Sequence, residues 1–445
     1  MWGPGGLCQP HSRPFSRACD APFTDRWQPP RGAEHSQPAG TDLRYHRTAM
    51  TERSWAAHWA LDPAVTFLNH GSFGACPTAV LAAQERLRRR LEAEPVRFLS
   101  RELDDRLDAA RAELGAFVGA DADDLAFVPN ATTGVNAVVR SLPFAAGDEL
   151  LATDHTYNAC RNALEFVAAR AGARVVIAPI PFPLDSPDRV VEAVMARVTP
   201  RTRLCLVDHV TSPTGLVLPL ARLVTELQAF GVETMVDGAH APGMLPLELR
   251  TLGATYYSGN CHKWLCAPKG AGFLYVRRDR QADVRPVTIS HGANARRPDR
   301  TRFRLEFDWT GTADPTAYLA VPEAIRFMAS LVPGGWPELT RRNRELALGA
   351  RRTLLKALRI EPPSPEEMIG SLVSVPLPDG APAADVAWRR PDPIQGALFE
   401  RHGFEVPVMS WPAPPKRLLR VSAQLYNTQA HYERLAEALV ALLPS

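Results

Sequence analysis

The stretch VETMVDGAHAPG, residues 232–243, decides which fold we expect for this chain. It begins as a short strand and places Asp237 at the strand's end, before a turn of small residues. Open α/β sheets bind ligands just outside the carboxyl ends of their strands, so a carboxylate at this point is a candidate site residue. The alternative role for Asp237 is a helix N-cap, because Asp before Gly and Ala commonly starts a helix.

Short apolar segments on both sides of this stretch predict more strands of the same sheet. The segments DLAFVPNATTGVNAVVRSL (124–142) and DELLATDHTYNACRNALEFVAARAG (148–172) each have the pattern of a strand, a turn and a helix. Strands are also predicted at ARVVIAPIPF (173–182), RLCLVDHV (203–210) and GAGFLYVRR (270–278). Short apolar strands that alternate with helices are typical of a buried, mainly parallel sheet, so we predict an α/β fold.

The pattern changes near residue 312, where we place a domain boundary. We expect residues 50–311 to form a large domain, with an N-terminal segment that contacts the smaller domain. Residues 312–445 should form that smaller α+β domain. Its helices are predicted over 315–332, 336–358, near 393–403 and over 429–442, with strands at GSLVSVPLP and LLRVSAQL between them.

Residues 1–49 differ in composition from the rest of the chain. They carry Pro, Gly, Arg and Ser without periodicity, and they lack the apolar stretch of a signal peptide. We expect a disordered extension there, or an upstream start codon with Met50 as the true start.

The overall composition narrows the classes of function. The net charge is only +3 at pH 7 and no long basic run occurs, so we expect no nucleic-acid partner. No stretch is long and apolar enough to span a bilayer, so we expect no membrane partner. The seven cysteines are an odd number without CxxC or metal-ligand spacing, which favours a cytoplasmic protein without a metal site.

The stretch SGNCHKWLCAPKGAG (258–272) holds a second chemical group. Among the 51 basic residues only Lys263, Lys269, Lys356 and Lys416 are lysines, so arginine is the usual cation of this chain. A lysine inside an Asn-Cys-His-Lys-Trp loop supplies a primary amine, which forms a Schiff base with an aldehyde once burial favours its neutral form. A surface lysine that caps a turn is the alternative for Lys263.

A third group lies in PNATTGVNAVV, where Thr132 and Thr133 open a helix directly after a strand. Exposed N–H groups, two hydroxyls and a following glycine can bind a phosphate, although a plain Thr N-cap is the alternative. A phosphate cradle, then a carboxylate, then a lysine is the order found in pyridoxal phosphate enzymes. In such an enzyme Asp237 would keep the pyridine nitrogen protonated and Lys263 would hold the aldehyde.

The chain resembles the class V aminotransferase family of fold-type I pyridoxal phosphate enzymes. Within that family it is most similar to proteins like the isopenicillin N epimerases and the hercynylcysteine sulfoxide lyases. The matching stretches, from about residue 65 to 442, are FLNHGSFGACP, NATTGVN, TDHTYNACRNAL, TSPTGLVLPL, VDGAHAPG, SGNCHKWLCAPKGAGFLYV, DWTGTADPTAYLAVPEAI, FEVPV and LLRVSAQLYNT. The resemblance implies a seven-stranded, mainly parallel sheet in the large domain, pyridoxal 5'-phosphate as cofactor, and a homodimer.

The resemblance also implies roles for residues around the cofactor ring. Lys263 would form the Schiff base and later shuttle the α-proton, and Asp237 would pair with the pyridine nitrogen. His240 would bond the ring hydroxyl. His155 would stack on the ring face, with Tyr157 as the competing candidate, whereas a buried histidine at a strand end is the plainer alternative for His155.

Other implied positions concern the phosphate and the substrate. The implied phosphate ligands are Thr132, Thr133, Asn260, His262 and, from the neighbouring subunit, Thr312 of WTGT. Arg420 would bind the substrate carboxylate by a bidentate pair, unless it is a structural arginine beside the sheet. Asn69 and His70 would line the substrate mouth.

Two departures from the family patterns bear on the chemistry. Cysteine desulfurases resemble this chain but carry a catalytic cysteine before the WTGT-like motif, and the stretch 289–307 has none. Cys261 and Cys266 flank the lysine, and we expect them to pack as small hydrophobic side chains. Ser212 of TSPTG takes the place of an asparagine that often touches the substrate, which makes Ser212 a candidate substrate contact.

Three reactions at the α-carbon of an amino acid or small peptide fit these residues: epimerisation, which we favour, C–S lysis or another β-elimination, and transamination. Epimerisation needs a base on each face of the α-carbon. Lys263 would serve one face, and Tyr157 and His70 are the candidates for the other. A catalytically idle binding homologue is the non-enzymatic alternative, against which the retained Lys263, Asp237 and Arg420 argue.

Overall fold

The computed structural model describes residues 55–380, 382 and 392–443. The prediction for residues 1–49 lies outside the described residues, and the domain boundary near residue 312 stays a prediction. Among the helices of the described part, none has both the length and the apolar character that crossing a bilayer requires.

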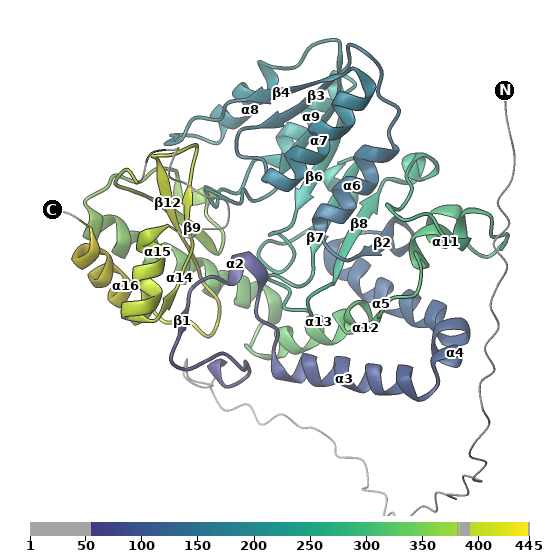
Figure 1. Cartoon of the computed structure of the whole chain (residues 1–445), viewed down its shortest axis with the longest axis horizontal. Helices are drawn as coiled ribbons and strands as arrows, with labels where there is room; N and C mark the ends of the chain where they lie inside the picture. The colour runs from purple at the N-terminus through teal and green to yellow at the C-terminus, as the bar shows by residue number, and fades with distance from the viewer. Residues whose placement is uncertain (1–54, 381, 383–391, 444–445) are drawn as a thin grey trace, which may run out of the picture. The chain divides into compact units, whose positions relative to one another are not determined.

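A seven-stranded sheet forms the centre of the fold (Figure 1). Its strands in spatial order are β2 (Leu125–Val128), β8 (Gly272–Val276), β7 (Tyr256–Asn260), β6 (Glu233–Gly238), β5 (Thr202–Asp208), β3 (Glu149–Thr153) and β4 (Arg174–Ala178). Only β8 runs antiparallel to its neighbours, and the other adjacent pairs are parallel. The predicted α/β fold with a mainly parallel sheet is therefore confirmed.

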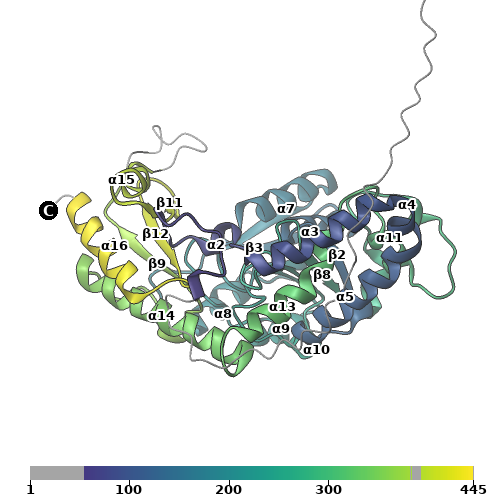
Figure 2. The ribbon, with the colours of Figure 1, turned by 90° about the horizontal axis from the view of Figure 1, so that it is seen from below.

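Two hydrophobic cores bury the two faces of this sheet. Within β5, Leu204 and Leu206 enter one core, whereas Cys205 and Val207 enter the other, because successive side chains of a strand point to opposite faces. The first core includes α6 (Ala131–Ser141) and α7 (Asn158–Ala171). The second includes α3 (Thr78–Ala93), α5 (Leu103–Val118), α8 (Asp188–Met195), α9 (Leu220–Ala229) and α13 (Val321–Ser330). In Figure 1 the helices α3, α5 and α13 lie below the sheet, and α13 packs beside both α3 and α5 (Figure 2).

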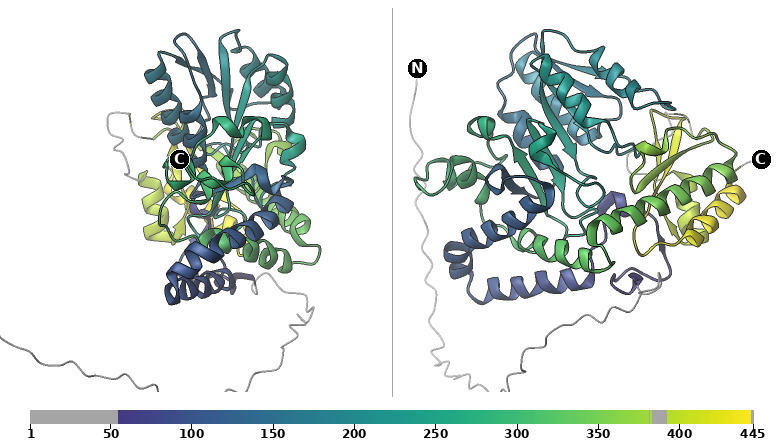
Figure 3. Two further views of the ribbon diagram at one scale, coloured as in Figure 1. Left: turned by 90° about the vertical axis from the view of Figure 1, so that its right-hand side faces the viewer. Right: turned by 180° about the vertical axis from the view of Figure 1, so that it is seen from behind.

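A second, antiparallel sheet lies in the C-terminal part of the chain. Its order is β11 (Val408–Ser410), β12 (Arg417–Ser422) and β9 (Leu372–Leu377). The helices α14 (Gly335–Leu358) and α16 (Gln429–Leu442) pack on it, and α14 also contacts α13 (Figure 3). Near the beginning of the described chain, β1 (Thr66–Phe67) pairs with β10 (Phe404–Glu405), which follows α15 (Pro393–His402). This pairing carries residues near 70 to the C-terminal sheet.

The helix predicted over 315–332 is divided in the structure. It forms α12 (Thr316–Leu319) and α13, with Ala320 between them. Pro322 lies in the first turn of α13. Proline has no N–H to donate to an earlier carbonyl, so it suits the start of a helix and interrupts one that would continue through it.

Candidate active site

A cavity of about 480 Å³ lies at the carboxyl ends of β5, β6 and β7. Side chains from those strand ends, from the start of α6 and from the turn after β1 line it. It brings together most of the predicted site residues, namely Thr132, Thr133, Tyr157, Ser212, Asp237, His240, Asn260, His262 and Lys263. The cavity therefore lies where open α/β sheets place their ligand sites, outside the carboxyl ends of the strands.

Lys263 follows β7 and lies against His240 rather than on the outer surface. Its Nζ is 3.2 Å from Nε2 of His240. Burial lowers the pKa of Lys263 to about 7, and the charge of Arg420 acts in the same direction. Burial and then the charge of Lys263 lower the pKa of His240 well below its usual range. Near neutral pH the site therefore holds a neutral imidazole beside an amine that loses its proton easily.

His70 fixes the loop that carries Lys263. Its Nε2 donates to the backbone oxygen of Lys263 (3.0 Å), and its Nδ1 accepts from the Tyr426 hydroxyl (2.7 Å). Gly74 allows the segment after His70 to pack closely against the loop that carries Lys263, because a Cβ at residue 74 would lie 2.1 Å from the backbone oxygen of His262. His70 thus uses both ring nitrogens for structure and does not line the cavity.

Asn69 also lies outside the cavity wall. Its Nδ2 donates to Glu405 Oε1 (3.2 Å), and its Oδ1 accepts from Ser72 Oγ (2.5 Å). The predicted mouth residues Asn69 and His70 are therefore replaced in the cavity wall by Ser72 and Phe73, three positions further along the chain. The HGSFG motif indicated the right segment, but the contacts with Glu405 and Tyr426 decide which of its side chains face the cavity.

Asp237 is the second-last residue of β6, and both of its carboxylate oxygens accept hydrogen bonds. Oδ1 accepts from the Ala239 N–H (3.0 Å), and Oδ2 accepts from the Cys160 thiol (3.1 Å). The chain forms a turn, not a helix, after Asp237, so the N-cap alternative does not apply. An anchored carboxylate at 4% exposure suits a partner with a fixed cationic N–H.

The start of α6 has the form of a phosphate cradle. Asn130 caps the helix, because its Oδ1 accepts from the Thr133 N–H (2.9 Å), so a threonine N-cap does not apply. Asn260 Oδ1 accepts from the Ala131 N–H (2.8 Å), which ties the helix start to the end of β7. The Thr132 side chain is not the cap, and it lines the cavity beside the positive end of the helix dipole.

Tyr157 and His155 take different positions. Tyr157 precedes α7, lines the cavity and is 45% exposed. His155 is buried outside the cavity wall, with Nδ1 bonded to the Thr214 hydroxyl (2.8 Å) and Nε2 near the Ile180 carbonyl oxygen (3.3 Å). The geometry therefore favours Tyr157 as the residue on the ring face, and it favours a structural role for His155 as a buried histidine at a strand end.

Arg420 reaches from β12 to the cavity rim with no acidic partner in the described part of the chain. Its Nη1 donates to the backbone oxygen (2.7 Å) and hydroxyl (3.1 Å) of Ser212, and its Nη2 donates to Ser72 Oγ (2.9 Å). Its buried Nε has no partner among the described residues. Burial lowers the pKa of Arg420 to about 10, which still leaves it cationic. A buried cation without a counter-charge has the chemistry to bind a small carboxylate.

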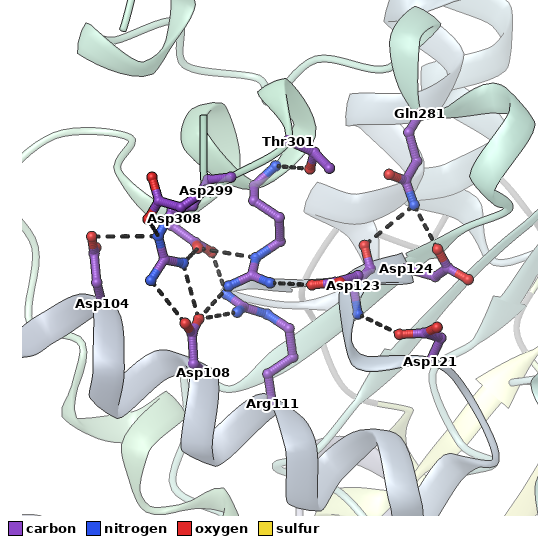
Figure 4. A network of polar contacts seen from close by, with 12 residues as sticks. Asp104, Asp108, Arg111, Asp121, Asp123, Asp124, Gln281, Asp299, Thr301 and Asp308 are labelled. Carbon is purple, nitrogen blue, oxygen red and sulfur yellow. Dashed lines mark hydrogen bonds and ion pairs between the residues drawn. The ribbon is translucent and has the colours of Figure 1, made fainter. Parts of the chain in front are cut away.

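Thr312 lies apart from the cavity in this single chain. It is exposed and follows α11 (Arg302–Asp308). A partly buried ion cluster holds α11 against α5 (Figure 4). In it Asp108 pairs with Arg300 (2.8 Å) and with Arg304, while Arg304 also pairs with Asp123 (2.7 Å). The cluster fixes the base from which the Thr312 turn projects.

Five lining residues were missed from the sequence besides Ser72 and Phe73, namely Asn130, Ala131, Asp208, Val210 and Ala239. Asp208 ends β5 as Asp237 nearly ends β6, so the strand-end rule would have found Asp208. Val210 follows two residues later. Cys160, which bonds Asp237, carried no local signal, because only the approach of α7 to β6 brings the two together.

The donor set fits pyridoxal phosphate. The cavity offers an easily deprotonated amine, an anchored carboxylate, a helix start with two threonine side chains and a buried His240 Nδ1 without a partner in the described residues. These match an aldehyde, a pyridine nitrogen, a phosphate and a ring hydroxyl in turn.

Comparisons with known proteins agree with this fit. The family model for aminotransferase class-V matches residues 68–435. An isopenicillin N epimerase of Amycolatopsis lactamdurans is 41% identical over 413 residues, which cover 88% of this chain and 100% of that protein. A putative L-cysteine desulfhydrase of Oryza sativa is 32% identical over 434 residues, covering 89% of this chain and 88% of that protein.

Solved structures show the same fold. The cysteine desulfurase CsdA from Escherichia coli superposes with a TM-score of 0.71 at 22% identity, over 89% of this chain and all of that one. The extent of the family match, together with the identity to relatives over most of their length, establishes the relationship. This chain belongs to the aminotransferase class-V family, whose members are fold-type I pyridoxal phosphate enzymes.

Proposed function

We propose that this protein is a pyridoxal-phosphate-dependent epimerase that inverts the α-carbon of an amino acid or small peptide. The observation that carries a reaction at the α-carbon is the placement of Arg420, a buried guanidinium without an acidic partner in the described residues, at the rim of the cavity that holds Lys263. The similarity to isopenicillin N epimerase along that protein's whole length supports inversion as the outcome.

The cofactor would be held by residues that already converge on the cavity. Lys263 would bind its aldehyde, Asp237 its pyridine nitrogen and His240 its ring hydroxyl, with Tyr157 against the ring face. The proposed phosphate ligands are Thr132, Thr133, Asn260, His262 and the partner subunit's Thr312.

Two side chains of the cavity would move the α-proton. Bound pyridoxal phosphate withdraws electrons from the α-carbon of an attached amino acid and so makes its proton acidic. Lys263 Nζ, with a pKa lowered to about 7, would accept that proton on one face. Burial raises the pKa of Tyr157, so its hydroxyl stays protonated and would donate on the other face. The other predicted candidate, His70, has both ring nitrogens occupied.

Arg420 would orient the substrate. Its Nη1 and Nη2 are fixed by Ser212 and Ser72, so the guanidinium is preorganised for a carboxylate. Ser212 and Ser72 would then contact the substrate carboxylate or its immediate neighbours. A carboxylate fixed at this point holds the α-carbon in one position while its proton is exchanged.

Proton NMR of the holoenzyme in heavy water would test the reaction. The panel contains L-amino acids, small peptides and S-substituted cysteines. Loss of the α-proton signal together with inversion, and without keto acid, is the expected result for a substrate. Keto acid and ammonia from S-substituted cysteines would identify a lyase instead. Conversion of the cofactor to its amine form would identify a transaminase, and retention of every α-proton would favour an idle binding homologue.

A C–S lyase is the second candidate, favoured by the similarity to the L-cysteine desulfhydrases. It would start from the same loss of the α-proton and then expel a sulfur leaving group from the β-carbon. A desulfurase with a cysteine nucleophile is less well supported, because burial raises the thiol pKa of every cysteine in the described ranges. These are Cys76, Cys160, Cys205, Cys261 and Cys266.

The protein would work as a homodimer in the cytoplasm. Phe73 lines the cavity and is nevertheless 72% exposed, which suits a surface that a second copy covers. The exposed Thr312 would then reach the neighbouring cavity. The free cysteines of the described part agree with a reducing compartment.

A further inference from the structure

Asp208 is a second carboxyl group in the floor of the cavity, and the proposed chemistry leaves it without a role. It ends β5 directly beside Asp237 on β6, with the two residues paired in the parallel register. Both side chains line the same cavity, at 2% and 4% exposure. Paired residues of parallel strands project to the same face of a sheet, so the two carboxyls lie close to each other.

The two carboxyl groups differ in their hydrogen-bond partners. Asp237 accepts hydrogen bonds at both oxygens, from the Ala239 N–H and from the Cys160 thiol. The Oδ2 of Asp208 is buried and has no hydrogen-bond partner in the described part of the chain. An ionised carboxylate is costly to bury without partners, whereas a protonated one has a hydrogen to donate.

We infer that Asp208 carries a proton and forms a carboxylic acid–carboxylate pair with Asp237, so that the two groups together hold a single negative charge under the pyridine nitrogen. Asp208 is then a positioning residue that acts through Asp237. The inference rests on the proposed role of Asp237 as partner of that nitrogen, and it goes beyond it by adding a second group to the proton-holding unit.

The charged groups around Asp208 favour a proton on Asp208 and a negative charge on Asp237. The titratable groups that face Asp208 are Asp237 on β6, Tyr157 just before α7, Cys160 on α7, and Lys263 after β7. Burial and then the charge of Asp237 raise the pKa of Asp208 well above its usual range, although the Tyr157 N–H and the Thr156 hydroxyl act in the opposite direction. Two adjacent carboxyls that share one proton are a known outcome of such repulsion.

A single shared charge would also matter for Lys263. The negative charges of Asp237 and Asp208 both act to raise the pKa of Lys263, against the burial that lowers it. A protonated Asp208 removes one of these two charges. The amine of Lys263 then loses its proton more easily, as its proposed role as a base requires.

Infrared difference spectroscopy of the holoenzyme at neutral pH tests the protonation of Asp208 directly. Asp208→Asn should remove a carboxylic acid C=O band that shifts in heavy water, because a carboxylate has no such band. Glu149→Gln is the matched control, since its buried carboxylate is paired with Arg174 and Arg201 and its pKa is lowered to about 2. An acid band of equal size in wild type and Asp208→Asn would overturn the inference.

Nitrogen-15 NMR of holoenzyme reconstituted with ¹⁵N-pyridine-labelled cofactor tests the pair. Wild type and Asp208→Asn should both show a protonated nitrogen, because asparagine resembles the neutral acid. In Asp237→Asn, Asp208 should lose its proton to solvent, become the single anion and keep the nitrogen partly protonated. The double variant should show the shift of an unprotonated nitrogen.

The two ways of failing are distinguishable. If Asp237→Asn already shows the shift of the double variant, Asp208 does not share the charge and the inference is overturned. If all four proteins give one signal, the proposed role of Asp237 fails instead. The infrared band still decides the protonation of Asp208 in that case, because it does not depend on the cofactor nitrogen.

Discussion

At the scale of single residues, the chemistry of Lys263 follows from its position. Its pKa is lowered to about 7, so the neutral fraction of its amine should rise roughly tenfold per pH unit below that value. The rate at which the cofactor-free chain takes up the cofactor can be measured by visible absorption. This rate should also rise about tenfold per pH unit below pH 7 and level off above it. Lys263→Ala should abolish the band, whereas Lys416→Ala, which removes a lysine paired with Asp379, should keep it. An unchanged band in Lys263→Ala would contradict the assignment.

At the scale of elements, α11 depends on the ion cluster with α5. Burial acts against the ionised form of Asp108, but Arg300 and Arg304 outweigh it and hold the pKa of Asp108 below its usual range. The ion pairs of Asp108 therefore stabilise the fold fully at pH values above the ordinary pKa of Asp. This stabilisation is lost as the pH falls through the lowered pKa of Asp108. Asp108→Asn should lower the free energy of unfolding by roughly 0.5–1 kcal/mol in denaturant titrations at pH 7, because Asp108 is 42% exposed and solvent screens its ion pairs. Asp105→Asn, at an exposed position of the same helix, should leave it unchanged; equal losses would show that the cluster is not responsible.

At the scale of the whole molecule, a second copy should complete the cavity. Light scattering should give twice the chain mass of 48.8 kDa. Thr312→Ala should weaken cofactor binding by roughly 10- to 100-fold without changing that mass, because it removes one hydrogen bond to a charged phosphate. Thr310→Ala, two residues earlier in the same exposed turn, should bind the cofactor like wild type. A monomeric mass in the presence of cofactor would exclude this arrangement.

The parts of the fold and site that depend on local sequence could be predicted. Asp237 and Lys263 stand at the ends of recognisable strands, and the start of α6 follows β2 directly, so topology alone brings them to one edge of the sheet. Side-chain direction within a turn could not be predicted. His70 and Ser72 are two residues apart, and contacts with Tyr426 and Arg420, far along the chain, decide which of them faces the cavity.

Roles at the end of β5 could not be predicted from the sequence either. Asp208 follows the strand-end rule as well as Asp237 does, but the sequence attached a known role only to Asp237. His155 and Tyr157 are likewise separated by one residue, and the bond of His155 to Thr214 turns it away from the cavity. Predictions from motifs therefore located the segments correctly, and tertiary hydrogen bonds selected the residues within them.

The hydrogen bonds that join Tyr426, His70 and the Lys263 backbone bear on the order of events during synthesis. The three residues come from the end, the beginning and the middle of the described chain, and the lysine loop is fixed only when all three are in place. Residue 426 leaves the ribosome long after residue 263, so a nascent chain that has just exposed its lysine still lacks this anchor. We therefore expect the newly made chain to acquire its cofactor only after residue 426 has been made and has folded, with apo-protein as the form produced first.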